Sequence, residues 1–205
     1  MKTALLSTAS GQAISTAVDL LQHGGLIAYP TDTVYGLAAL LTDAAAIDRI
    51  FTAKQRSPVK AIAVLIGSLE QLQLVTTALP PAALRLAERF WPGALTLVVP
   101  RHPSLPANLS PDDTIGVRMP DHAFARALLQ AAGPLATTSA NLSGGPNPRD
   151  AQEVLAQLDG RVELVLDGGP TPVGVPSTVV GCTAPQITIL REGALSAEQI
   201  WQALA

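Results

Sequence analysis

The sequence predicts an α/β fold whose sheet combines parallel and antiparallel strands and is flanked by helices. Strand-like and helix-like hydrophobic patterns alternate along most of the chain, which is typical of α/β proteins. Three strand-like segments, residues 164–167, 177–181 and 186–191, have no helix between them, and such short connections favour antiparallel pairing. The chain has 205 residues, of which 48% are hydrophobic and 14% charged, so we expect one domain over residues 1–205.

The first half of the chain contains two helix-start signals. Thr42 can cap a helix over residues 43–54. Ser68 with Gln71 has the pattern of a capping box for a further helix. The expected strands of this half are 26–30, 34–41, 61–66 and 95–100, and other expected helices end at Gly24–Gly25 and Phe90.

The second half repeats the alternation. Ser196 with Gln199 is a second capping-box pattern, and it opens a helix at the C-terminal end. A loop rich in Gly, Pro and Asn occupies residues 142–149. The remaining expected elements are strands over 114–119 and 135–141, and helices over 121–132 and up to Leu158.

Composition argues against several classes of function. The net charge is −3, from 13 Lys and Arg against 16 Asp and Glu, which disfavours nucleic-acid binding through a dense basic surface. The single cysteine cannot form an internal disulfide, and no Cys and His pair has zinc-ligand spacing. The N-terminal segment is too weakly apolar for a secretion signal, and no apolar run approaches the ~18 residues of a membrane-spanning helix. We therefore expect a cytoplasmic location and no membrane contact.

Strand 114–119 carries polar residues on one face. Its period of two places Thr114, Gly116 and Arg118 on the same side. One interpretation is an edge strand with a solvated face. The other is the wall of a cleft, with an arginine that binds an anion and a glycine that allows close approach of a ligand.

Strand 135–141 shows the same pattern. Thr137, Ser139 and Asn141 share a face and lead directly into the Gly-rich loop. Ordinary turn chemistry at a strand end explains this arrangement. Uncharged hydrogen-bonding groups of this kind also suit a polyphosphate or an amino acid.

Two cations follow the helix over 43–54. Lys54 and Arg56 are two residues apart, so they cannot share a helical face, but on a loop both can enter one pocket. Alternatively they only end the helix, because cations are favoured at a helix C-terminus.

Three further polar positions lie where loops meet strands. Asp32 can close a turn through its side chain, and Thr33 beside it can face a ligand. Ser177 is a hydroxyl at the start of a strand. Arg191 ends the last strand, where it faces a ligand or forms only a surface ion pair with Glu192.

Familiar phosphate-binding and nucleophile motifs are missing. The sequence has no Walker A loop, no G-x-G-x-x-G fingerprint and no G-x-S-x-G elbow. Cys182 is expected to be a buried strand residue and His23 a helix-end residue. Because no side chain is an obvious covalent nucleophile or general base, the sequence favours non-covalent catalysis.

The order of the motifs is far more specific than any one of them. PTDTVYGL is followed by AKQRSPVK, WPGALTLVV, TIGVRMPDH, TTSANLSGGPNP, GVPSTVV and ILREG. This succession, over residues 24–193, resembles the YrdC/TsaC family of threonylcarbamoyl-AMP synthases. The resemblance implies a twisted open sheet with a concave active-site face. It also implies a nucleotidyltransferase that makes threonylcarbamoyl-AMP and pyrophosphate from L-threonine, bicarbonate and ATP, with Mg²⁺ carried on the ATP phosphates.

The resemblance further implies a downstream partner and roles for individual side chains. A transferase would move the threonylcarbamoyl group to the tRNA adenosine next to the anticodon. Lys54 and Arg56 are expected to contact the nucleotide phosphates and to be catalytic. The other expected ATP contacts are Thr52, Thr114, Ser139, Asn141, Asn147 and Arg191. The expected threonine contacts are Thr33, Arg118, Thr137 and Ser177, and no metal ligand is expected from the protein.

The sequence departs from the family pattern in three places. Leu65 stands where the longer branch often has a histidine, and Asn147 stands where the family often has a serine. The longer branch also has a C-terminal domain, whereas this sequence ends at residue 205, so we expect the short form.

The sequence also allows two rival interpretations. The first is a non-catalytic module that binds double-stranded RNA or tRNA, and weak RNA contact is also expected as a secondary property of the enzyme. The second is the related domain of hydrogenase-maturation carbamoyltransferases, which the cysteine count argues against.

Overall fold

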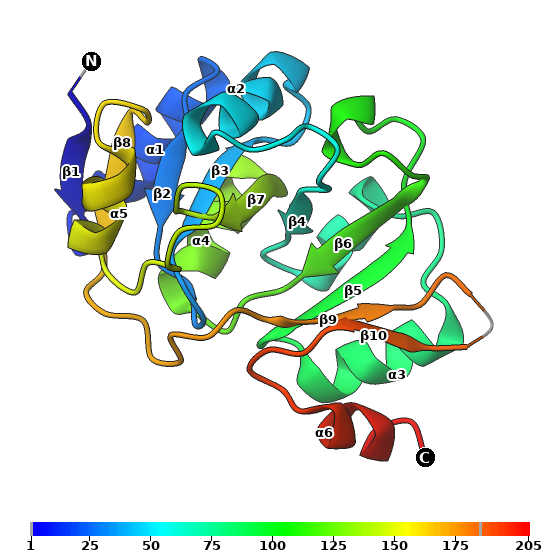
Figure 1. Ribbon diagram of the computed structural model, residues 1–205. Helices are drawn as coiled ribbons and strands as arrows, with labels where there is room; N and C mark the ends of the chain where they lie inside the picture. Colours follow the sequence, from blue (N-terminus) through cyan, green and yellow to red (C-terminus); the bar gives the residue numbers. More distant parts are fainter. Residues whose placement is uncertain (1, 185) are drawn as a thin grey trace.

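The computed structural model describes residues 2–184 and 186–205 and shows one continuous sheet (Figure 1). The sheet has ten strands in the order β1-β8-β2-β3-β7-β4-β6-β5-β9-β10. The strands are β1 (Ala4–Ser7), β2 (Ile27–Tyr29), β3 (Gly36–Leu40), β4 (Ala63–Leu65), β5 (Leu95–Pro100), β6 (Thr114–Arg118), β7 (Leu135–Ser139), β8 (Leu164–Asp167), β9 (Thr178–Gly181) and β10 (Thr188–Arg191).

The sheet is mixed, as predicted. β1 and β2 pair with β8 in parallel, as do β4 with β6 and β5 with β9. The remaining neighbours pair antiparallel, including the late strands β9 and β10. β6 lies between β4 and β5, so the interpretation of segment 114–119 as an edge strand is wrong.

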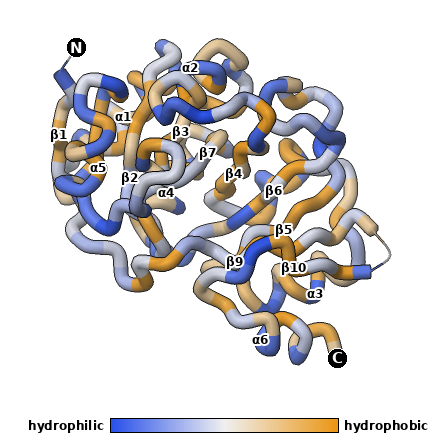
Figure 2. Tube along the Cα trace, in the orientation of Figure 1, coloured by the Kyte–Doolittle hydropathy of each residue, from blue (hydrophilic) through white to orange (hydrophobic). Residues whose placement is uncertain are grey.

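Helices pack on both faces of the sheet. α1 (Ala13–Gln22) and α4 (Ala123–Ala132) bury apolar residues in one core cluster, with alternate residues of β2 and β8. α2 (Ala44–Lys54), α3 (Pro81–Phe90) and α5 (Ala151–Leu158) contribute to the larger cluster on the opposite face, and the short α6 (Ala197–Gln202) adds Ile200. Figure 2 shows hydrophobic residues gathered along the strands and hydrophilic residues mainly in loops and on outer helix turns.

Two expected helix starts differ from the structure. Thr42 does not cap α2, because Asp43 has extended backbone and its carboxylate accepts a hydrogen bond from the amide of Ala46. Ser68 and Gln71 form no capping box: the segment Leu69–Leu74 is a 3₁₀ helix. The Gln71 side chain instead accepts from the Gly67 amide and donates to the Leu129 carbonyl, which ties this segment to α4.

The C-terminal capping box of Ser196 and Gln199 is confirmed. Strand β1 was missed, because Ala4–Ser7 is short and largely exposed and so lacks a clear apolar alternation. Within residues 2–184 and 186–205, no helix has both the length and the apolar character needed to cross a bilayer.

Candidate active site

A cavity of about 420 Å³ lies over the strands in the middle of the sheet. Residues of β3, β4, β5, β6, β7 and β9 line it, together with residues from the loops that join these strands. Its size is typical of a small-molecule site. Of the predicted site residues, those in the lining are Thr33, Arg56, Arg118, Thr137, Ser139, Asn147, Ser177 and Arg191.

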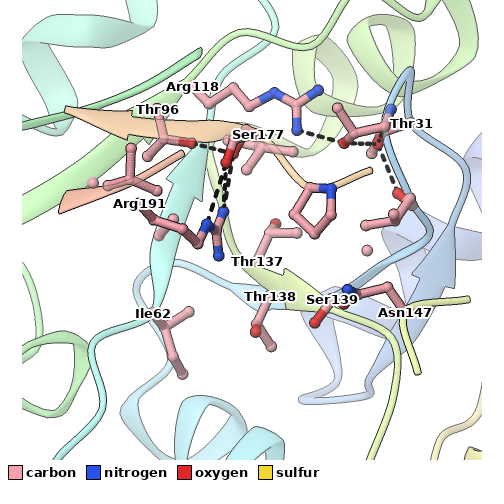
Figure 3. A pocket seen from close by; sticks show the side chains of 18 of the residues that line it. Thr31, Ile62, Thr96, Arg118, Thr137, Thr138, Ser139, Asn147, Ser177 and Arg191 are labelled. Atoms are coloured by element: carbon pink, nitrogen blue, oxygen red, sulfur yellow. Dashed lines mark hydrogen bonds between the residues drawn. The ribbon is translucent and has the colours of Figure 1, made fainter. Parts of the chain in front are cut away.

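One corner of the cavity is built around a buried arginine (Figure 3). The Arg118 guanidinium donates from Nε to the Gly93 carbonyl at 2.9 Å and from Nη1 to Thr33 Oγ1 at 2.7 Å. Its Nη2 donates to the carboxylate of Asp32, which is also buried. Burial lowers the pKa of Arg118, and the nearby Asp32 charge opposes that shift. Asp32 therefore supports an arginine, whereas the sequence had suggested a turn-closing residue.

A second part of the cavity carries two arginines without acidic partners. Arg56 follows α2, and Arg191 ends β10. Within the described part of the chain, neither forms an ion pair, which corrects the surface-pair interpretation of Arg191. Burial lowers the pKa of both, and the Arg191 charge lowers that of Arg56 further. Two neighbouring cations of this kind favour a bound polyanion.

The hydrogen bonds of these two arginines leave donors for a ligand. Arg56 Nη2 donates to the Ala61 carbonyl at 2.9 Å, and its buried Nε has no partner among the described residues. Arg191 donates from Nε and Nη2 to the Ser177 carbonyl at 3.3 and 2.7 Å. Because each guanidinium has five N–H groups, several remain for an anion.

Lys54 lies beneath this region and not in the cavity lining. Its Nζ donates to the carbonyls of Ser139 and Asn141 and to Asn141 Oδ1, at 2.5, 2.6 and 3.1 Å. Gln55, with a positive φ of 51°, turns the chain between the two cations, so that only Arg56 enters the cavity. A direct phosphate contact by Lys54 would break one of its three hydrogen bonds.

Asn141 belongs to the same buried network as Lys54. Its Oδ1 also accepts from Ser139 Oγ at 2.6 Å, and its Nδ2 donates to the Gly145 carbonyl at 2.7 Å. Asn141 is therefore placed to hold the loop after β7 and not to face a ligand. Thr52 and Thr114 are also outside the lining: Thr52 is exposed on α2, with its hydroxyl bonded to the Asp48 carbonyl, and Thr114 begins β6 away from the cavity.

The hydroxyl of Thr137 is fixed by two buried partners. Thr137 Oγ1 lies 3.2 Å from the Tyr29 hydroxyl and donates to the Leu135 carbonyl at 3.1 Å. Tyr29 is fully buried, and its burial raises the pKa of the phenol, so Tyr29 stays neutral.

Sequence reasoning missed four lining residues with hydroxyl groups, which are Thr31, Tyr35, Thr96 and Thr138. Thr31 donates to the Val34 carbonyl at 2.7 Å, and the Tyr35 hydroxyl donates to the Gly169 carbonyl at 2.8 Å. Thr96 Oγ1 lies 2.8 Å from Ser177 Oγ. A signal for Thr96 was present, because the period of two in strand β5 places it opposite the apolar Leu95 and Leu97.

Comparison with known proteins identifies the family. The family model of Sua5, YciO and YrdC proteins, which carries the description "Telomere recombination", matches residues 19–193. The chain belongs to this family. A Bacillus subtilis member named threonylcarbamoyl-AMP synthase is 43% identical over 201 residues, covering 95% of this chain and 57% of that protein. The chain thus spans little more than half the length of this curated relative.

Solved structures of Sua5/YciO/YrdC members have the same fold. The crystal structure of P. abyssi Sua5 complexed with L-threonine superposes with a TM-score of 0.94 at 38% identity, covering 100% of this chain and 61% of that chain. E. coli YciO superposes with a TM-score of 0.84 at 28% identity, covering 97% of this chain and 98% of that chain. The predicted family and the predicted open mixed sheet are both confirmed.

Proposed function

We propose that this cavity synthesises threonylcarbamoyl-AMP and pyrophosphate from L-threonine, bicarbonate and ATP. The observation that carries the proposal is the presence of two anion-binding groups, Arg118 with Thr33 and Arg56 with Arg191, in one cavity. The buried Arg118 with Thr33 suits a single carboxylate, whereas Arg56 and Arg191 suit a polyphosphate. The names of the similar proteins, and the threonine in the P. abyssi complex, support the same assignment.

Threonine would bind in the Arg118 corner. Its carboxylate would accept from Arg118, and its amino and hydroxyl groups would lie near Thr33, Thr137 and Ser177. The amino nitrogen attacks bicarbonate, water is lost, and a carbamate forms. A carbamate oxygen then attacks the α-phosphorus of ATP, and the bond to the leaving pyrophosphate breaks.

The nucleotide would lie between this corner and the guanidinium groups of Arg56 and Arg191. Arg56 and Arg191 would offset the charge that develops on the phosphates and on the leaving pyrophosphate, and Ser139 and Asn147 add uncharged contacts. Catalysis then rests on positioning and electrostatic stabilisation. We assign Lys54 and Asn141 to holding the loop after β7, with Thr52 and Thr114 as outer contacts of the nucleotide at most.

Mg²⁺ would enter with ATP. The part of the chain that the structure describes holds no group of three or more His, Cys, Asp or Glu side chains suited to a metal. The lining offers hydroxyl and amide oxygens and no carboxylate, which fits a hard cation bound mainly by phosphate oxygens and water. When bound, Mg²⁺ would add charge stabilisation at the phosphates.

The product would pass to a transferase that modifies tRNA. A mixed anhydride of a carbamate and AMP is an activated acyl donor, so its consumer must bring a nucleophile such as a base amino group. Weak contact between this chain and tRNA belongs to the same proposal. The same proposal places the protein in the cytoplasm, where ATP and unmodified tRNA are both present.

Pyrophosphate release tests the proposal. Purified protein with ATP and Mg²⁺ is assayed with and without L-threonine, and with and without bicarbonate. We expect release that requires both, and mass spectrometry should detect threonylcarbamoyl-AMP. Folded protein that releases no pyrophosphate with threonine would refute the proposed activity. Salt-dependent binding to tRNA by that same protein would then favour the RNA-binding alternative.

A further inference from the structure

Thr96 occupies an unassigned position in the wall of the cavity. It lies on β5, is 6% exposed and lines the cavity beside Ser177, which precedes the neighbouring strand β9. Its Oγ1 lies 2.8 Å from Ser177 Oγ, as the dashed line between them in Figure 3 marks. Among residues 2–184 and 186–205, Ser177 is the only partner of the Thr96 hydroxyl.

The rotamer of Thr96 is set by packing. A Cβ at Gly116 of β6 would lie 3.1 Å from Thr96 Cγ2, so the methyl group rests against the glycine backbone. A β-branched side chain has few alternative rotamers on a strand. With its methyl group placed against Gly116, Thr96 directs its hydroxyl at Ser177.

Counting donors leaves two polarities for the pair. A hydroxyl has one donor and two acceptor positions, and an arginine can only donate. Arg191 Nη2 approaches Ser177 Oγ at 3.4 Å and therefore occupies one acceptor position of Ser177 weakly. Either hydroxyl can donate to the other, and the one that accepts keeps its own proton for a group in the cavity, because both side chains line it. Donation from Thr96 leaves the Ser177 proton for a ligand, so a ligand oxygen beside Ser177 selects that polarity.

We infer that Thr96 is a positioning residue, which directs the Ser177 hydroxyl to donate to an oxygen of the bound substrate. This inference rests on the proposed function, in which that oxygen belongs to threonine or to its carbamate. Thr96 acts only through Ser177, so its removal should change threonine binding and leave ATP binding unaffected.

The test compares Thr96→Val, which removes the hydroxyl and keeps the shape, with Thr96→Ser, which keeps the hydroxyl. In the pyrophosphate assay we expect Thr96→Val to raise KM for L-threonine about tenfold, equivalent to ~1.4 kcal/mol, with KM for ATP unchanged. Thr96→Ser should restore KM for threonine toward the wild-type value. Thr188→Val on β10, outside the cavity lining, is the matched control.

The double variant separates positioning from a structural role. The double variant Thr96→Val/Ser177→Ala should have the same KM for L-threonine as Ser177→Ala alone, because the two residues act as one unit. Additive losses, or a wild-type KM for threonine in Thr96→Val, would overturn the inference while leaving the proposed function intact. Wild-type protein that neither binds nor uses threonine would overturn both. Should Thr96→Val not fold, Thr96→Ala, which relieves crowding against Gly116, has the same expected outcome.

Discussion

The Asp32 carboxylate accepts a hydrogen bond from Arg118 Nη2, and both side chains are buried, with Arg118 in the cavity lining and Asp32 behind it. Three of the five N–H groups of Arg118 are thereby engaged, with Asp32, Thr33 and the Gly93 carbonyl. Each terminal nitrogen retains one N–H for a ligand. Asp32 thus fixes the plane of the guanidinium that is proposed to bind the threonine carboxylate.

Removing Asp32 should therefore weaken threonine binding. We expect Asp32→Ala to raise KM for L-threonine on the order of tenfold or more and to lower stability by ~3–5 kcal/mol, because Arg118 would be left buried without a counter-charge. Asp32→Asn keeps an oxygen acceptor for Nη2 and should lose less affinity than Asp32→Ala. Steady-state kinetics and urea unfolding measure these effects, with the exposed Asp112→Ala as control. A wild-type KM for L-threonine in both Asp32 variants would show that the orientation of Arg118 by Asp32 does not limit threonine binding.

Arg56 and Arg191, which form no ion pair within the described residues, should dominate turnover. Arg56→Ala and Arg191→Ala should each lower kcat/KM for ATP on the order of 10²-fold, because each removes a preorganised donor from the developing phosphate charge. Arg56→Lys should recover only part of this loss, since lysine keeps the charge but not the planar fork. The exposed Arg85→Ala on α3 is the charge-matched control. Wild-type turnover in both alanine variants would remove Arg56 and Arg191 from the mechanism.

Lys54 should make stability depend on pH. Burial, and then the nearby Arg56 charge, lower the pKa of Lys54 to about 7, from 10.5 for the unfolded chain. Between these values the unfolded state holds a proton that the folded state has lost, so the free energy of unfolding rises as the pH rises above 7. Below pH 7 both states are protonated, and this contribution is constant.

Urea unfolding of wild type and Lys54→Met at pH 6, 7.5 and 9 measures this effect. Relative to Lys54→Met, the wild type should gain stability with pH, approaching ~1.4 kcal/mol per unit above pH 7. Lys60→Met, which removes an exposed lysine, should follow the wild type. A pH-independent difference would mean that the Ser139 and Asn141 oxygens keep the ammonium charged through pH 9.

Gly36 should not tolerate a side chain while Thr137 keeps its methyl group. A Cβ at Gly36 would lie 2.8 Å from Thr137 Cγ2, which is too close without a shift of one strand. We expect Gly36→Ala to destabilise the protein by ~1–3 kcal/mol, as overpacking does, and to lower activity because Thr137 moves.

Thr137→Ser removes the methyl group that the new Cβ would meet, so it provides a specific rescue. Thermal unfolding should place the double variant Gly36→Ala/Thr137→Ser above Gly36→Ala alone. A double variant as unstable as the sum of its single changes would show that the strain lies elsewhere, for example against the Tyr29 ring at 3.6 Å.

Local patterns predicted most of the elements. Apolar alternation located β5, β6 and β7 and correctly placed Gly116 with Arg118, and Thr137 with Ser139, on the cavity side. The order of seven short motifs identified the family. These signals succeed because side-chain periodicity and turn chemistry are local properties of the backbone.

Other features could not be predicted because they depend on distant partners. Asp32 and Arg118 are 86 residues apart in the sequence. Lys54 Nζ donates to the carbonyls of Ser139 and Asn141, which are 85 and 87 positions further along the chain. A lysine at the end of a helix usually faces solvent, so nothing local distinguished Lys54 from Arg56. Strand β1 likewise exists because β8 offers it a parallel partner.

Local sequence patterns are therefore enough to predict the α/β class, the faces of the central strands and the set of polar residues that belong together. Which of these residues enter the cavity depends on the turn at Gln55 and on the pairing of strands distant in sequence, because these set the direction of each side chain. The tertiary structure places Arg56 in the cavity, Lys54 beneath it and Thr96 beside Ser177. Buried polar groups need partners, and the fold supplies those partners from segments that no local pattern connects.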